Sequence, residues 1–347
     1  MGNLKGSILL TGANGGLGCG IVRRIITTPE FLSHHGIYLV RDASRANALK
    51  YVLANAPAPY SYQILSLDLS RLPNVREVAR DLKTRIAAGE IPPIRALALG
   101  AGYVDLGDHS WTDEGFDTAF VANYLGHWLL TMMLLESMDR EYGRIIVVGS
   151  SSYDVEHPHH LLDGHYREEK WKVFFREDNL DAIVHGTWST NEDAVHIRHA
   201  GTRRYGVAKM CAMMMVGELQ RRLDADPALK RISIAGIDPG VMGTELTRRS
   251  NWFTRVVLWP IIVPMLALLL TWFYPNGHVR TIRKSAGDAL KAAFEAGDET
   301  RGKLLNGSEA MGVVPEAADA QKRLMVWRDS VKYTQLEGQD TALMQWK

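Results

Sequence analysis

Two tyrosine–lysine pairs in this chain have the spacing that proton transfer to a carbonyl group requires. Tyr166 and Lys170 lie four residues apart in "HYREEKWK", and Tyr205 and Lys209 repeat the spacing in "RYGVAK". On a helix this spacing places a phenol and an ammonium on one side of a turn. The phenol can give a proton to a ketone oxygen, and the ammonium can lower the phenol's pKa from its ordinary value of about 10. Spacing alone does not choose between the pairs.

The neighbours of the two pairs favour Tyr205 and Lys209. Residues 205–223 combine an apolar helical face with small residues, and a strand-like segment follows at 232–240. The residues around Tyr166 are charged and lead into irregular chain, so we interpret that pair as a solvated helical turn. A catalytic pair has to stand on a helix that packs against the sheet, and only the second pair does so.

A glycine-rich loop, "TGANGGLG" at residues 11–18, follows an apolar run and opens a helical stretch. Gly12, Gly16 and Gly18 would let the backbone turn tightly and approach a pyrophosphate at the positive end of the helix. The setting between a strand and a helix makes this loop a stronger indication of dinucleotide binding than the glycines alone.

Strand and helix signals alternate along most of the chain. The strand-like runs are apolar without polar alternation, which is typical of a parallel sheet buried on both faces. They lie at 6–12, 36–41, 62–70, 94–102, 143–151, 232–240 and 302–307, with helical stretches at 18–26, 75–89, 116–138, 205–224 and 285–297. This order predicts an α/β fold with a Rossmann-type doubly wound parallel sheet.

The whole chain, 1–347, is interpreted as one domain with three additions. An insertion at 152–204, rich in histidine and charge, precedes Tyr205. An apolar lid region follows at 245–280, and a polar, partly helical tail occupies 315–347. The insertion should lie over the place where substrate binds, and its histidines, whose spacings match no common zinc pattern, are expected at a loop surface without metal.

The motifs TGANGGLG, "NYLGH" and "YGVAK", in that order, resemble those of the short-chain dehydrogenase/reductase family. The resemblance covers residues 6 to about 310 and is strongest to retinol-dehydrogenase-like members and to reductases of fungal secondary-metabolite pathways. It implies that Ser150 polarises the substrate carbonyl, although Ser151 and Ser152 leave a register shift of one open. It also implies that Asn123 holds a water of the proton relay.

The same resemblance implies a set of cofactor contacts. These are Gly12, Asn14, Gly16, Leu17, Gly18, Arg41, Asp68, Leu69, Gly100, Ala101, Gly102, Tyr205, Lys209, Pro239, Gly240, Val241 and Thr244. One departure is "LGAG" at 99–102, where the family usually has "NNAG". Two amide side chains are lost there, so the local bracing of the sheet must differ.

The end of the second predicted strand bears on the choice of cofactor. A basic side chain there pairs with the 2′-phosphate of NADP, whereas an acidic one accepts the ribose hydroxyls of NAD. The sequence reads "YLVRDASR", so Arg41 favours NADP(H) and Asp42 leaves NAD open.

Composition excludes several classes of protein. Hydrophobic residues make up 46% and charged residues 23% of the chain, as in a soluble globular enzyme. A net charge of +1 provides no basic excess for a nucleic-acid partner. Two cysteines cannot form a disulfide framework, and the first residues contain no secretory signal, so a cytoplasmic location is expected.

The apolar run 256–274 raises the question of a membrane. Pro260 and Pro264 argue against an uninterrupted spanning helix, and a helix that starts at Pro264 is too short to span. The run is interpreted as a buried or membrane-touching lid, so peripheral membrane contact is one expected association. A homodimer is another, because helices four and five pair in many family members, unless the insertion covers that surface.

These observations lead to one main hypothesis and two alternatives. The main hypothesis is an NADP(H)-dependent oxidoreductase that transfers hydride between nicotinamide and a lipophilic ketone or alcohol, as a secondary-metabolite ketoreductase of polyketide or terpenoid type. A retinol- or steroid-type alcohol dehydrogenase is the first alternative. A cofactor-binding scaffold without turnover is the second, and the intact set of Ser150, Tyr205 and Lys209 argues against it.

Overall fold

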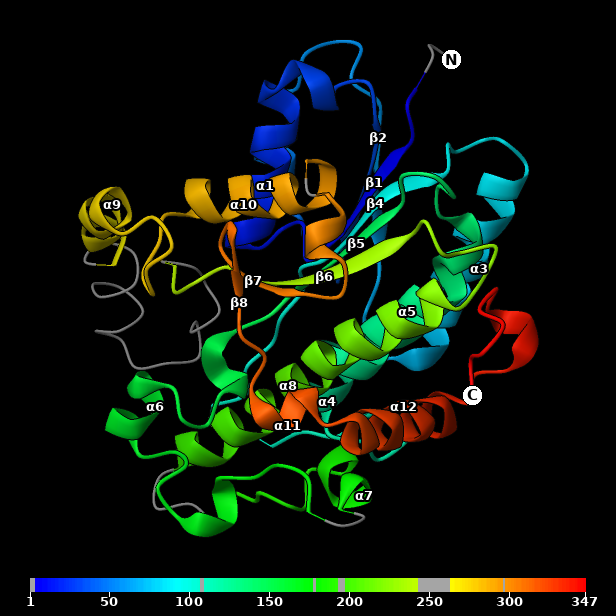
Figure 1. Ribbon diagram of the computed structural model, residues 1–347. Coiled ribbons are helices and arrows are strands. Elements are labelled where there is room, and N and C mark those ends of the chain that lie inside the picture. Colours follow the sequence, from blue (N-terminus) through cyan, green and yellow to red (C-terminus); the bar gives the residue numbers. More distant parts are fainter. Residues whose placement is uncertain (1–3, 107–108, 177–178, 193–196, 243–262, 296) are drawn as a thin grey trace.

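The computed structural model describes the chain except residues 1–3, 107–108, 177–178, 193–196, 243–262 and 296. An eight-stranded sheet in the order β3-β2-β1-β4-β5-β6-β7-β8 forms its centre (Figure 1). The strands are β1 Ser7–Thr11, β2 His35–Val40, β3 Tyr62–Ser66, β4 Ile94–Leu99, β5 Arg144–Val148, β6 Ser233–Asp238, β7 Leu304–Asn306 and β8 Glu309–Met311. All neighbouring pairs are parallel except β7 and β8, which are antiparallel.

Helices cover both faces of this sheet (Figure 1). The first apolar cluster joins the sheet to α3, α5 and α8, and the second joins it to α1, α2 and α10. The bounds are α1 Gly16–Thr27, α2 Asn47–Leu53, α3 Leu72–Ala87, α5 Gly126–Leu134, α8 Ile197–Asp224 and α10 Ile282–Phe294. Strands covered on both sides need apolar residues on both sides, which explains their unbroken apolar runs. The predicted doubly wound sheet is confirmed.

The order of the strands reverses between β1 and β4, because the chain first winds outward to β3 and then returns. In such sheets ligands bind beyond the carboxyl ends of the strands at the point of reversal. The glycine loop follows β1, and Ser150 follows β5, so both lie at that edge.

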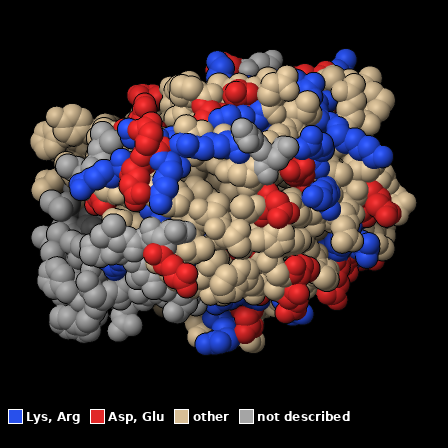
Figure 2. Space-filling model, turned by 90° about the horizontal axis from the view of Figure 1, so that it is seen from below, with Lys and Arg blue, Asp and Glu red and all other residues tan. Residues whose placement is uncertain are grey.

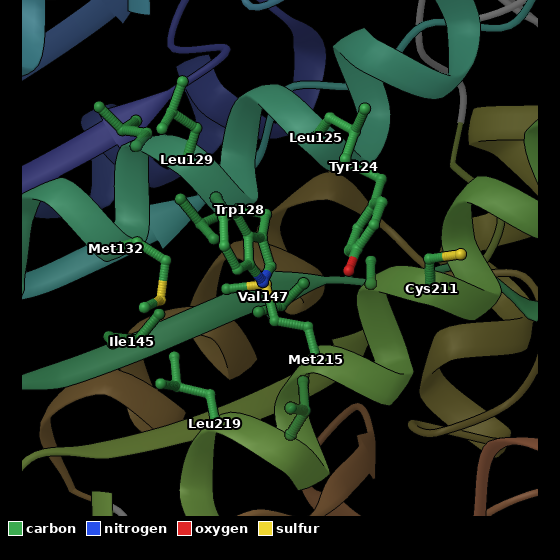
Figure 3. Packing of buried hydrophobic residues seen from close by; sticks show 14 of the residues in the cluster. Tyr124, Leu125, Trp128, Leu129, Met132, Ile145, Val147, Cys211, Met215 and Leu219 are labelled. Carbon is green, nitrogen blue, oxygen red and sulfur yellow. The ribbon is translucent and has the colours of Figure 1, made fainter. Parts of the chain in front are cut away.

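Among the described residues, one long apolar helical run lies inside the protein core. Residues Thr118–Ser137 are long and apolar enough to span a bilayer, but 89% of that window is buried inside the protein. The run comprises α4 Thr118–Phe120, the π-helical turn η2 Val121–Leu125, α5 and η3 Leu135–Ser137. In Figure 3, Trp128 and Met132 of α5 lie among residues of β5 and α8.

The insertion is packed, contrary to the expectation of a solvated turn. Tyr166 is only 4% exposed, and its hydroxyl donates a hydrogen bond to the carbonyl of Ser152. Its ring packs edge-on against Phe174, which in turn contacts Trp188. Aromatic residues interspersed with charged ones form this small core, so the charges concealed its apolar pattern. Lys170 is exposed, as expected.

Short helices organise the insertion, and the following helix begins earlier than expected. The described parts contain α6 Pro158–Asp163, η5 Glu169–Trp171 and α7 Leu180–Val184. Helix α8 begins at Ile197 rather than at Tyr205. The catalytic tyrosine candidate therefore lies two turns inside a helix whose start belongs to the insertion.

The histidines of the insertion do not all lie at a loop surface, which corrects a second expectation. His160 is 4% exposed, and its ring packs edge-on against Tyr166. The rings of His165 and His199 are 4.7 Å apart. Within the described part of the chain, no group of three or more His, Cys, Asp or Glu side chains is arranged to hold a metal ion.

The tail, for which the sequence indicated no role, is part of the core. It contains α11 Pro315–Ala318 and α12 Ala320–Thr334, and α12 packs along α8. Trp327 of α12 is 1% exposed and meets Trp128 of α5 edge-on, at 5.3 Å between ring centroids. Arg222 of α8 lies over the Trp327 ring. The tail thus contacts the two long helices that flank β5, and every residue of α5 is buried. Pairing of two copies through α5 and α8 would require α12 to move.

The apolar run 256–274 lies partly outside the described residues. Its described part forms α9 Val263–Phe273, which projects at the left edge of Figure 1. A short parallel bridge between Val241 and Val279 brings together the two chain ends that flank this region. On the face shown in Figure 2, basic and acidic side chains are interspersed, so this face offers no continuous basic surface to a nucleic acid.

The buried position of Trp327 predicts a large effect on stability. We expect Trp327→Ala to lower the free energy of unfolding by about 3–5 kcal/mol, because it leaves a cavity between α12 and α5. Leu324→Ala, at a side chain that is 46% exposed in the same helix, should change it by about 0.5 kcal/mol or less. Denaturant unfolding, followed by far-ultraviolet circular dichroism, measures both changes. Equal small effects of the two substitutions would mean that the tail does not stabilise the domain.

Candidate active site

The glycine loop has a geometry that only glycine permits. Gly12 has a φ of +71°, and a Cβ there would lie 2.7 Å from the Ala101 Cα. A Cβ on Gly18 would lie 2.2 Å from the Gly12 carbonyl oxygen. Gly15 precedes α1 without a side-chain cap, and Gly16 is the first residue of the helix. The first N–H groups of this twelve-residue helix have no side-chain cap, and glycines flank them. They therefore fit a pyrophosphate group.

A threonine and a histidine replace the amide bracing that the LGAG sequence lacks. The N–H groups of Gly100 and Ala101 donate to Thr11 Oγ1 at 2.9 and 3.1 Å, and Thr11 Oγ1 lies 2.9 Å from His127 Nε2. An oxygen that accepts two N–H bonds has its own hydrogen free to donate, so Nε2 is the acceptor. Burial lowers the pKa of His127 to about 3, helped by the charge of Lys209, so the ring is neutral. The sequence reasoning missed both residues.

Ser150, Tyr205 and Lys209 come together at the carboxyl end of β5. The Ser150 hydroxyl acts on the Tyr205 phenol, whose pKa it lowers, and it also donates a hydrogen bond to Ser152 Oγ at 3.0 Å. Tyr205 is 6% exposed and Lys209 is 3% exposed. Lys209 Nζ donates to the Val148 carbonyl at 2.9 Å and lies 5.6 Å from the centroid of the Tyr205 ring.

Burial controls the protonation of this pair, and it opposes the expected effect of the lysine. It raises the pKa of Tyr205 to about 12, although the Ser150 hydrogen bond lowers it in part. It lowers the pKa of Lys209 to about 8, and Asp238 opposes that change. The expectation that Lys209 lowers the phenol's pKa is therefore wrong for this state. The ammonium is directed to the Val148 carbonyl, and desolvation of the phenolate is the larger effect.

Asn123 lies in the π-helical turn, and its side chain is fully engaged. Its Nδ2 donates to the carbonyls of Tyr103 and Ala119, and its Oδ1 accepts the N–H of Tyr103 at 3.0 Å. The amide thereby ties the loop after β4 to the helix. Its main-chain carbonyl, in the π-helical turn, lies 3.5 Å from His127 Nδ1, so the relay water at Asn123 stays a prediction.

Two arginines directly before Tyr205 were also missed by sequence reasoning. The Arg204 guanidinium is buried, lies 3.3 Å from the Asp117 carboxylate and donates to the Ser189 carbonyl at 2.8 Å. Asp117 also caps the helix that leads to Asn123, by accepting the N–H of Phe120. Arg203 stacks on Trp171 at 4.0 Å from the ring centroid. These contacts join the insertion, the Asn123 helix and the Tyr205 helix.

The remaining predicted cofactor residues lie along the same edge of the sheet. Asn14 accepts the N–H of Leu49, and Asp68 accepts the N–H and hydroxyl of Ser70. Gly240 has a φ of +70° and donates its N–H to the Asp238 carboxylate. The others in place there are Leu17, Leu69, Gly102, Pro239 and Val241, whereas Thr244 lies outside the described residues.

The end of β2 presents Arg41 to solvent. Asp42 Oδ1 accepts both the N–H and the hydroxyl of Ser44, and these bonds lower the pKa of Asp42. One carboxylate oxygen of Asp42 is thus already occupied. Arg41 is left as the side chain that a phosphate at this position could approach.

Known proteins are similar to this chain in sequence. A family model described as short chain dehydrogenase matches residues 7–161. Short-chain dehydrogenase iccH from Talaromyces variabilis is 41% identical over 365 residues, which cover 99% of this chain and 100% of that protein. A protochlorophyllide reductase from Cucumis sativus is 25% identical, over 94% of this chain and 77% of that protein.

A solved structure shows the same fold. The angucycline C-6 ketoreductase LanV with bound NADP matches with a TM-score of 0.57 and 17% identity, over 88% of this chain and 96% of that one. At that identity the match supports the fold, and the family rests on the relative that matches along its full length. With its glycine loop and its Ser150, Tyr205 and Lys209 cluster, the chain belongs to the short-chain dehydrogenase/reductase family.

Proposed function

We propose that this protein is an NADP(H)-dependent ketoreductase that acts on a lipophilic ketone of secondary-metabolite type. The observation that carries the proposal is the burial of Tyr205 and Lys209 together at the end of β5, where Lys209 donates to the Val148 carbonyl and Ser150 follows two residues later. A phenol with a pKa of about 12 is protonated at neutral pH, which is the state that gives a proton to a ketone. LanV, one protein of known structure with this fold, is a ketoreductase.

The roles of the residues follow from their positions. NADPH, when bound, supplies hydride to the carbonyl carbon of the ketone. Tyr205 donates its phenolic proton to the carbonyl oxygen as negative charge develops there, and the Ser150 hydroxyl donates a hydrogen bond to the same oxygen. Lys209 places a positive charge beside the tyrosinate that remains. A water on the Asn123 main-chain carbonyl would return the proton.

Two features support NADP(H) as the cofactor. The glycine cradle from Gly12 to Gly18 fits a pyrophosphate, and Arg41 is exposed where a 2′-phosphate would lie. Asp42, which would favour NAD, is engaged by Ser44. The LanV structure contains bound NADP.

Replacing the tyrosine of each tyrosine–lysine pair by phenylalanine, in separate variants, tests the catalytic assignment. We expect Tyr205→Phe to lower kcat for ketone reduction at least about 100-fold, because the general acid is lost. Tyr166→Phe removes a hydroxyl that only supports the insertion and should retain most of the activity. NADPH oxidation at 340 nm measures both, and the reverse order of losses would refute the assignment.

A second substitution tests the cofactor. Wild-type protein should prefer NADPH to NADH, and Arg41→Ala should raise KM for NADPH roughly 10- to 100-fold, the range expected for loss of a charge-assisted hydrogen bond. KM for NADH should change little. Arg23→Ala, at an exposed arginine of α1, serves as the control. Comparable wild-type turnover with both cofactors at equal concentration would refute the choice of NADP(H).

The exposed apolar surface of α9 supports peripheral membrane contact. Ala267 is buried, whereas Leu268, Leu269, Trp272, Phe273 and Tyr274 are 62–77% exposed. At 3.6 residues per turn, the four exposed residues that belong to α9 span more than a third of the helix circumference, and none of them is charged. Eleven residues reach about 16 Å, too short to cross a bilayer core of about 30 Å. Trp and Tyr next to such a surface are typical of the membrane interface, where a lipophilic substrate would also collect.

Flotation with lipid vesicles tests this contact. Wild-type protein should float with phosphatidylcholine vesicles that contain phosphatidylserine, and Trp272→Ser combined with Phe273→Ser should reduce the bound fraction at least about tenfold. Tyr51→Ser, at an aromatic side chain that is 72% exposed elsewhere, is the matched control. Equal binding of all three proteins, or no binding by the wild type, would refute the contact.

A further inference from the structure

A small polar cavity lies beside the catalytic residues and has no part in the chemistry described so far. Its volume is about 120 Å³, and it opens between the loops that follow β5, β6 and β7. It is lined by Ser151, Tyr153, Asp154, His157, Asp238, His278, Arg280, Asn306 and Met311. Eight of these nine side chains are polar, unlike the apolar residues expected around a lipophilic ligand.

Tyr153 gives this cavity an unpaired hydroxyl. The side chain is 1% exposed, and its hydroxyl has no hydrogen-bond partner among the residues that the structure describes. A buried hydroxyl without a partner costs free energy, and native proteins retain few of them. Burial, together with the charges of Asp154 and Asp238, raises the pKa of Tyr153, so it remains a phenol and can donate.

The cavity lies at the same edge of the sheet as the catalytic pair. Ser151 directly follows Ser150, and β6, which ends at Asp238, pairs with β5 along Val148. Asp238 lines the cavity, and its charge also acts on both Tyr205 and Lys209. A group bound in the cavity would therefore belong to the molecule whose carbonyl lies at Tyr205.

The lining charges select the chemistry of that group. Asp154 and Asp238 disfavour a carboxylate, and the Arg280 guanidinium disfavours an ammonium. Arg280 is itself held, since it donates to the carbonyls of Asp238 and Gly277 at 2.9 and 2.7 Å. A neutral group that can donate to a carboxylate and accept from the Tyr153 phenol satisfies both requirements, and a hydroxyl is the simplest such group.

We propose that this cavity binds a hydroxyl group of the substrate, so that the enzyme acts on hydroxylated ketones rather than on plain apolar ones. The proposal rests on the ketoreductase function and makes its substrate class more specific. The substrate would be amphiphilic, with a hydroxyl held by Tyr153 and Asp154 near the carbonyl that is reduced. A site built to hydrogen-bond a hydroxyl discriminates strongly against analogues that lack it, because its own polar groups are then left unpaired.

The experiment compares α-tetralone with the isomeric derivatives of it that carry one ring hydroxyl, each as a substrate with NADPH. Wild-type protein should reduce at least one isomer with a kcat/KM about tenfold or more above that of α-tetralone. Tyr153→Phe should reduce this preference about tenfold while α-tetralone itself is turned over within about twofold of the wild-type rate. Tyr38→Phe is the control. It removes a buried phenol in β2, which β1 and β4 separate from β5, and the variant should keep the preference for the hydroxylated ketone.

Thermal unfolding provides a readout that does not depend on activity. Without substrate, Tyr153→Phe should unfold at the same temperature as wild type or higher, because it removes an unpaired buried hydroxyl. With NADP⁺ and the preferred hydroxylated ketone, the wild type should gain more stability than the variant. A clear loss of stability without ligand would mean that the hydroxyl has a structural partner, and it would overturn the proposal.

The outcomes separate the two levels of the argument. Turnover of α-tetralone with no preferred isomer, or a preference that Tyr153→Phe leaves unchanged, overturns the hydroxyl site and leaves the ketoreductase function standing. No turnover of any ketone with either cofactor overturns the ketoreductase function and this proposal with it.

Discussion

Burial of a phenol next to an ammonium is the constraint on which the rest of the site depends. Tyr205 and Lys209 are almost completely removed from solvent, and each loses hydration that favours its charged form. The structure offsets this loss in part: the Val148 carbonyl accepts a hydrogen bond from the ammonium, and the Ser150 hydroxyl lowers the pKa of the phenol. Both partners come from the end of one parallel strand, so the sheet must be in register for the pair to exist.

The elements around the pair are tied to one another by polar contacts made at the same edge. Asn123 holds the loop after β4, and Thr11 with His127 holds the end of β4 itself. Arg204 carries this network into the insertion through Asp117 and Ser189. Because the guanidinium is one residue from Tyr205, the packing of the insertion and the position of the catalytic phenol are mechanically linked. The insertion thus supports the helix that carries Tyr205.

Sequence patterns predicted the features that depend on local chemistry. The glycine loop could be recognised because only glycine fits the approach of Gly12 to Ala101, and the Tyr205 pair because its helix has an apolar face. The packing of Tyr166 could not be recognised, since its partners Phe174 and Trp188 are separated from it by charged residues. The raised pKa of Tyr205 could not be predicted from the sequence either, because desolvation depends on every residue that packs around the ring. The role of Trp327 required knowing that α12 returns to α5.

The protein exposes an apolar helix and encloses a cavity lined mostly by polar residues. Helix α9 exposes leucines and aromatic rings to the outside, whereas the cavity next to Ser150 is lined by carboxylates, imidazoles and a phenol. An entirely apolar substrate would suit the apolar surface of α9 but leave the polar groups of the cavity unpaired. A highly polar one would have no reason to meet an apolar helix. A ketone with a large apolar body and a hydroxyl near its carbonyl matches both, because its body can partition toward α9 while its hydroxyl replaces the water that Tyr153 would otherwise need.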